Sequence, residues 1–177
     1  ALTAGVDDFL TKPVMRADIY RILQRLSGEI SASANEAREE ENYDFTGKRL
    51  LIAEDNELNM EVARELCEHV GFTVECAYNG KEAVEKFAAS GPGYYDAILM
   101  DVHMPAMNGN EAARAIREMK RSDAHSVAII AMTANAFYED AAEAIRSGMN
   151  EHLAKPIEPE AIFAALYKFL YDKKSRL

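Results

Sequence analysis

The chain has 177 residues, a formal net charge of −10 and 49% hydrophobic residues. This length suffices for one domain of ordinary size and a smaller unit, but not for two full domains. The acidic balance argues against nucleic-acid binding, which requires a basic face, and no apolar run approaches the roughly 20 residues that cross a bilayer. We therefore expect a cytoplasmic segment without membrane contact of its own, which is compatible with a membrane-anchored parent protein.

The first 28 residues contain a pattern that returns near the end of the chain. Residues 5–13, GVDDFLTKP, align without gaps on residues 148–156, GMNEHLAKP, and the apolar positions that follow keep the same phase. We interpret residues 1–28 as the last β-α unit of a preceding copy of the same domain. Residues 29–46 are rich in Ser, Ala, Asn and acidic residues, which predicts a solvated acidic linker, so the complete domain is expected at residues 47–177.

From residue 47 onward, short apolar runs alternate with segments of helical period. In chain order, the expected elements are a strand at residues 50–53, a helix at 58–70, a weaker strand at 74–77, a helix at 83–87, a strand at 97–100, a helix at 112–119, a strand at 127–132, a helix at 137–147, a weaker strand at 152–154 and a helix at 162–170. The three nearly unbroken apolar strands are typical of a parallel sheet that is covered on both faces. Five β-α units in series predict an α/β fold with a doubly wound parallel sheet.

Side chains suited to catalysis follow these strands at the points where the strands end. Glu54 and Asp55 follow the first strand, Asp101 the third, Thr133 the fourth and Lys155 the fifth. Because the carboxyl ends of parallel strands meet at the edge where open α/β sheets bind ligands, we expect these side chains to lie together. Singly, each has an alternative structural explanation as a cap or turn residue, and only their co-location favours a site.

Three carboxylates brought together would raise one another's pKa unless a cation holds them. Hard oxygen ligands suit Mg²⁺, which favours sites that a phosphate completes. With Mg²⁺ and Lys155 drawing charge from a phosphoryl group, we expect the carboxylate of Asp101 to be the nucleophile that displaces imidazole and forms an acyl phosphate. Thr133 is then expected to donate a hydrogen bond to a phosphoryl oxygen.

Four segments carry a resemblance to a known family. They are LLIAEDNELN ending at Asn59, ILMDVHMPAMNG ending at Gly109, IIAMTANA ending at Ala136, and LAKP ending at Pro156. Together they resemble the receiver domain of two-component response regulators over about residues 47–172. The residues around Asn56, Asn59 and Thr133 are most similar to those in receivers of hybrid sensor histidine kinases. In such a protein, a preceding receiver would account for the fragment at residues 1–28.

The resemblance implies a flavodoxin-like sheet of strand order 2-1-3-4-5 with helices on both faces. The Mg²⁺ ligands that it implies are the side chains of Glu54, Asp55 and Asp101 and the backbone carbonyl of His103. Lys155 would pair with the phosphoryl group, Thr133 would follow that group, and the bond from Lys155 to Pro156 would be cis. The implied function is phosphorelay signalling, with a histidine kinase or a histidine phosphotransfer protein as the phosphoryl donor.

Two positions depart from the family's pattern. His152 occupies the switch position that is commonly aromatic, and Asn108 replaces the usual acidic residue of its loop.

The fourth helix, at residues 137–147, is alanine-rich with few large anchors, so we expect the face that it forms with the fifth strand and fifth helix to rearrange on phosphorylation. Self-association through this face or through residues 1–28 is a further expectation.

Three alternatives fit parts of the pattern. A haloacid-dehalogenase-type phosphohydrolase also forms an aspartyl phosphate, but it requires Asp-x-Asp where this chain has adjacent Glu54 and Asp55. A flavodoxin-like cofactor binder requires a glycine-rich phosphate loop at the same place. A degenerate receiver that only binds proteins is disfavoured by the intact acidic set. No segment resembles a kinase ATP-binding region or a DNA-binding output domain, so we expect the output function elsewhere.

Overall fold

The computed structural model describes residues 43–133, 138–156 and 158–171. The predicted fragment at residues 1–28 and nearly all of the predicted linker lie outside these residues. In chain order the elements are β1 (Arg49–Ala53), α2 (Glu57–His69), β2 (Thr73–Ala77), α3 (Gly80–Ala89), β3 (Ala97–Asp101), α4 (Gly109–Arg117), β4 (Ala128–Thr133), α5 (Tyr138–Arg146), β5 (Glu151–Ala154) and α6 (Pro159–Tyr171). Each strand and helix that the sequence predicted in this region is therefore present.

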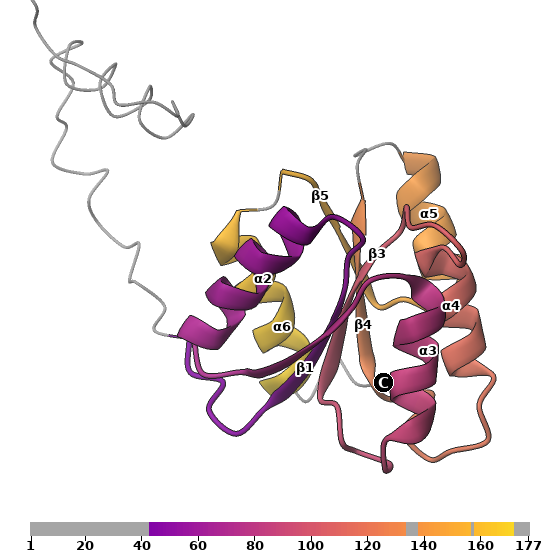
Figure 1. Ribbon diagram of the computed structural model, residues 1–177, viewed down its shortest axis with the longest axis horizontal. Helices are drawn as coiled ribbons and strands as arrows, with labels where there is room; N and C mark the ends of the chain where they lie inside the picture. The colour runs from indigo at the N-terminus through magenta and orange to yellow at the C-terminus, as the bar shows by residue number, and fades with distance from the viewer. Residues whose placement is uncertain (1–42, 134–137, 157, 172–177) are drawn as a thin grey trace, which may run out of the picture. The chain divides into compact units, whose positions relative to one another are not determined.

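The five strands form one parallel sheet of order β2-β1-β3-β4-β5, which confirms the doubly wound, flavodoxin-like topology. Helices α2 and α6 cover one face of the sheet, and α3, α4 and α5 cover the other (Figure 1). Because the strands run in the same direction, their carboxyl ends meet at one edge. Within the described residues, no helix is both long and apolar enough to span a bilayer.

A separate hydrophobic core lies on each face of the sheet, because successive side chains of a strand point to opposite faces. The cluster under α3, α4 and α5 includes Leu51, Ile98 and Ile129. The cluster under α2 and α6 includes Ile52, Leu99 and Ile130. All residues of β3 and β4 are buried, whereas β2 and β5 are the edge strands and are mostly half-buried. This difference explains why the edge strands gave the weaker sequence patterns.

The packed domain begins four residues before the boundary predicted at Gly47, since it includes Tyr43 to Thr46. Phe45 is fully buried, and its ring stacks on Phe72 with 4.4 Å between the centroids. The ring of Tyr43 lies 5.7 Å from that of Tyr167 on α6, and the Tyr171 hydroxyl donates a hydrogen bond to the Asp44 carbonyl at 3.1 Å. Composition alone predicts a linker here, because the partners of this short aromatic segment on α6 are distant in sequence.

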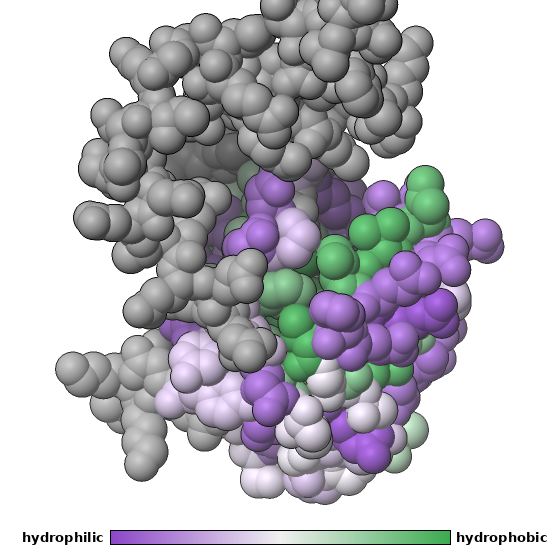
Figure 2. All heavy atoms as spheres, turned by 90° about the vertical axis from the view of Figure 1, so that its left-hand side faces the viewer, coloured by the Kyte–Doolittle hydropathy of each residue, from purple (hydrophilic) through white to green (hydrophobic). Residues whose placement is uncertain are grey.

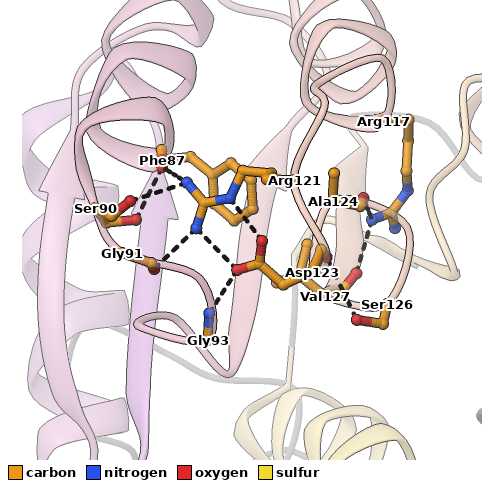
Figure 3. A network of polar contacts seen from close by, with 10 residues as sticks. All are labelled: Phe87, Ser90, Gly91, Gly93, Arg117, Arg121, Asp123, Ala124, Ser126 and Val127. Atoms are coloured by element: carbon orange, nitrogen blue, oxygen red, sulfur yellow. Dashed lines mark hydrogen bonds and ion pairs between the residues drawn. The ribbon is translucent and has the colours of Figure 1, made fainter.

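Two arginines fasten the loops at the sheet edge opposite the carboxyl ends (Figure 3). The Arg121 guanidinium lies over the Phe87 ring, 4.1 Å from its centroid, pairs with Asp123 at 2.6 Å and donates to backbone carbonyls at the end of α3. Arg117 donates to the carbonyls of Ala124 and Val127 at 2.7 and 2.9 Å. These contacts connect the loops at the amino ends of the strands, so the carboxyl ends are supported by a well-packed domain.

Candidate functional site

The carboxyl ends of β1, β3 and β5 bring together the charged residues that the sequence placed there. The Lys155 ammonium lies 2.5 Å from Glu54 Oε2 and 2.6 Å from Asp101 Oδ2. Glu54 and Asp101 are almost completely buried, with 2% and 4% of their surfaces exposed, whereas Asp55 is exposed. The result is a recessed carboxylate pair bridged by one ammonium group, with a third carboxylate at the rim.

The position of Asp101 is determined by the buried strand that precedes it and the tight loop that follows. Its Oδ1 accepts a hydrogen bond from the His103 backbone N–H at 3.1 Å. The loop ends in a capping box at the start of α4, in which Asn108 and Glu111 exchange hydrogen bonds of 3.0 and 2.9 Å. Asn108 thus has a capping role that its place in the loop did not reveal from the sequence. Gly109 passes so close to the Asp101 backbone that a Cβ would lie 2.2 Å from its carbonyl oxygen.

Glu54 is held by the start of α2 as well as by Lys155. Its Oε1 accepts hydrogen bonds from the Asn59 side-chain amide at 3.1 Å and from the Asn56 backbone N–H at 3.3 Å. In the sequence, Asn59 stands out only as part of a segment that resembles receiver domains, and no pattern there indicates a role for it. The available signal was its position five residues after Glu54, in the first turn of the predicted helix, from which a side chain can reach back toward the strand end.

Burial and pairing act in opposite directions on the two central groups. Burial raises the pKa of Asp101, and this effect exceeds the lowering by Lys155 and the His103 N–H, while the charge of Glu54 raises it further. Burial lowers the pKa of Lys155, but its hydrogen bonds with Asp101 and Glu54 outweigh burial and bring that pKa above its ordinary value. Lys155 is therefore firmly protonated, and the carboxylate of Asp101 is less stabilised than it would be in water.

The donor set fits a hard divalent cation. One carboxylate oxygen from each of Glu54, Asp55 and Asp101 lies within 4.8 Å of the other two. Oxygen ligands of this kind, few in number and open to solvent on one side, suit Mg²⁺ with several waters retained. The predicted contribution of the His103 carbonyl remains a prediction, because the contact seen for His103 is made by its N–H group.

The remaining predicted residues lie at the same edge. Thr133 is fully buried at the end of β4, and its carbonyl oxygen accepts a hydrogen bond from the Lys155 N–H at 2.7 Å. The peptide bond from Lys155 to Pro156 is cis, as the resemblance implies. His152 is half-buried in the edge strand β5, opposite Ala131 of β4, and its proposed switch role stays a prediction.

The fold and the site define a class of protein, a doubly wound α/β domain whose ligand edge presents clustered carboxylates and one lysine. Residues 50–167 match the family model of the response regulator receiver domain, and the chain belongs to this family. It therefore carries a receiver domain, the module that takes part in the phosphorelays of two-component signalling.

Three comparisons illustrate the relationship. Hybrid signal transduction histidine kinase B of Dictyostelium discoideum is 39% identical over 130 residues, which are 68% of this chain and 6% of that protein. The receiver domain of sensor histidine kinase PA1611 from Pseudomonas aeruginosa PAO1, solved with a magnesium ion in its active site cleft, is 34% identical with a TM-score of 0.64, over 71% of this chain and 98% of that one.

The third is a chain in the co-crystal structure of the Saccharomyces cerevisiae histidine phosphotransfer protein Ypd1 with the receiver domain of its downstream response regulator Ssk1. It is 27% identical with a TM-score of 0.63, over 72% of this chain and 95% of that one. The chain spans between 6% and 19% of the length of eight curated relatives that it matches.

Proposed function

We propose that Asp101 accepts a phosphoryl group from the phosphohistidine of a histidine kinase or a histidine phosphotransfer protein, in a reaction that requires Mg²⁺. The observation that supports this most directly is the Lys155 ammonium, which bridges the buried carboxylates of Asp101 and Glu54 at 2.6 and 2.5 Å, beside the carboxylate of Asp55. A cation within reach of both an acceptor carboxylate and the place of an incoming phosphoryl group is the arrangement that such a transfer requires.

The proposed chemistry assigns a task to each side chain. A carboxylate oxygen of Asp101 forms the new bond to phosphorus while the bond from phosphorus to the imidazole nitrogen of the donor breaks, and the freed imidazole keeps that electron pair. Lys155 then shifts from the carboxylates toward a phosphoryl oxygen, and the Thr133 hydroxyl donates to another. Bound by Glu54, Asp55, Asp101 and the His103 carbonyl, Mg²⁺ would supply positive charge against the phosphoryl oxygens.

The first prediction tests the acceptor. Incubation with acetyl phosphate and Mg²⁺ should give a hydroxylamine-labile adduct on Asp101, visible as a mass shift and mapped by digestion. Asp101→Asn should abolish the adduct because it removes the nucleophile while keeping the side-chain shape, and Lys155→Ala should slow its formation. An undiminished adduct on Asp101→Asn would place the acceptor elsewhere, and steady release of phosphate from a phosphate ester would favour the phosphohydrolase alternative.

A groove beside the site supports a proposal about where the phosphoryl donor binds. An apolar groove of about 330 Å³ lies next to Glu54 and Lys155, between α2 and α6. Leu58 and Val62 line it and are 69% and 50% exposed. Figure 2, which looks at the side of the domain on which α2 lies, shows hydrophobic side chains gathered into one patch. We propose that a helix of the donor protein lies in this groove, which would bring its phosphohistidine to Asp101.

The second prediction tests this groove. Leu58→Glu and Val62→Glu should each slow phosphotransfer from a cognate phosphotransfer protein by about tenfold or more, because each places a charge in a buried apolar contact. Labelling by acetyl phosphate, which needs no docking, should be unchanged. Ile145→Glu on α5, at a residue that is 49% exposed, is the matched control. If only the control variant slowed the transfer, the donor would dock on α5 instead.

Two expectations from the sequence stay proposals. One is that the face formed by α5, β5 and α6 rearranges upon phosphorylation. Residues 134–137, which lead into α5, lie outside the described residues. Self-association through residues 1–28 likewise concerns residues outside the description.

A further inference from the structure

Both oxygens of the Glu54 carboxylate are occupied, each by a different part of the fold. Oε2 accepts from the Lys155 ammonium at 2.5 Å, on the side of the acidic cluster. Oε1 accepts from the Asn59 side-chain amide at 3.1 Å and from the Asn56 N–H at 3.3 Å, on the side of α2. With only 2% of Glu54 exposed, these contacts decide where its carboxylate points.

The start of α2, where Glu54 accepts two hydrogen bonds, departs from the ordinary helix capping that is seen at the start of α4. At the start of α4, the Asn108 side chain accepts a hydrogen bond from the Glu111 N–H, and the Glu111 side chain accepts one from the Asn108 N–H. This pair is a complete capping box. At the start of α2, Asn56 likewise accepts from the Asn59 N–H at 3.0 Å. Here, however, the N–H of the cap residue and the side chain of the residue three positions later both donate to Glu54.

The residue type at this position is essential to the arrangement. A carboxylate at position 59 would occupy the cap N–H and repel Glu54, whereas an amide can donate to Glu54 and leaves the cap N–H for it. Glu54 also needs such support, since the torsion that rotates a glutamate carboxylate is broad and only weakly restrained by itself. Two donors on Oε1 therefore fix the direction in which Oε2 faces the cluster.

We propose that Asn59 is a positioning residue, which holds the Glu54 carboxylate in the orientation that the magnesium site requires. The inference rests on the magnesium site proposed above. Asn59 itself would contact neither the metal nor the phosphoryl group. It acts through Glu54, in the way that outer partners of metal ligands set ligand orientation and thereby metal affinity.

The test compares the Mg²⁺ affinity of three forms of the domain by isothermal titration calorimetry. Asn59→Ala should raise the Kd for Mg²⁺ by about tenfold, which is the lower end of the usual effect of losing an outer partner. Asn56→Ala is the matched control, because it removes the helix cap three residues away but keeps the backbone N–H that contacts Glu54. It should lower the melting temperature and leave the Kd unchanged.

A double-mutant cycle adds a readout that a general loss of structure would not produce. Aspartate at position 54 is one methylene shorter and cannot keep its contacts with both Lys155 and Asn59, so Asn59→Ala should have no further effect on the Kd in the Glu54→Asp background. Equal affinities of wild type and Asn59→Ala, or equal losses for Asn56→Ala and Asn59→Ala, would overturn this inference alone. Failure of the wild-type domain to bind Mg²⁺ would overturn the magnesium site and this inference together.

Discussion

At the scale of the residue, the site is a balance between burial and charge. The carboxylate of Asp101 loses most of its contact with water, and its bonds to Lys155 and the His103 N–H do not fully replace it, so its pKa is raised. A carboxylate in this condition gains more than a solvated one when a dication or a new covalent bond takes up its charge. The same residue therefore reduces the stability of the domain when no divalent ion is bound, and it favours the proposed reaction.

The third prediction follows from the sign of this shift. Because the folded state binds the Asp101 proton more tightly than the unfolded state does, stability falls as pH rises from the ordinary aspartate pKa of about 3.9 through the raised folded-state value. Asp101→Asn removes this loss, so the variant should melt at a higher temperature than wild type at pH 7 without divalent ions. The difference should shrink as pH falls toward 4. Thermal unfolding of both proteins across this range measures it, and an equal or lower melting temperature for the variant at pH 7 would contradict it.

At the scale of the element, the loop between β3 and α4 is where packing and chemistry constrain each other most closely. Gly109 begins α4 and lies directly against the backbone of Asp101. A methyl group there would meet the Asp101 carbonyl oxygen at 2.2 Å and the Met100 side chain at 3.0 Å. Since the first of these atoms belongs to the buried strand β3, the loop would have to move, and the contacts that follow Asp101 would move with it.

The fourth prediction concerns this contact. Gly109→Ala should destabilise the domain by about 2 kcal/mol or more, in the range measured for overpacked interiors. It should also slow formation of the Asp101 adduct. Gly91→Ala is the control, because no atom lies within 4 Å of a Cβ placed there. Urea unfolding of both variants decides the matter, and equal stabilities would show that the loop absorbs the methyl group without cost.

At the scale of the whole molecule, the domain is closed by contacts between its first and last described segments. The buried ring of Phe45 packs under α6, and Tyr43 lies against the outer aromatic side chains of that helix. Phe45 is therefore part of the core on the α2 and α6 side of the sheet, and Tyr43 packs against that core. The beginning of the domain and its last helix stabilise each other.

The fifth prediction uses this closure. A fragment that begins at Gly47 should be less stable than one that begins at Tyr43 by about 3 kcal/mol or more, because it lacks a buried phenylalanine. Phe45→Ala in the full chain should reproduce most of the loss. Equal midpoints of chemical unfolding for the two fragments would show that the aromatic segment packs without stabilising the domain.

The sequence by itself determined the order and type of the elements and the identity of the central charged residues. The buried strands β3 and β4 appear as unbroken apolar runs because both of their faces are covered, and the edge strands appear weaker because theirs are half-open. Residues such as Asp101 and Lys155 could be assigned to one edge because they follow strands, and parallel strands end together.

The tertiary structure alone decided which of these residues touch and which neighbours hold them. Glu54 and Lys155 are 101 positions apart, and no local pattern indicates that one ammonium bridges two carboxylates. The same holds for the Asn59 contact with Glu54, for the exposure of Leu58 on α2 and for the burial of Phe45. Each depends on where a distant element packs, and a periodic pattern reports that a face is apolar without reporting what covers it.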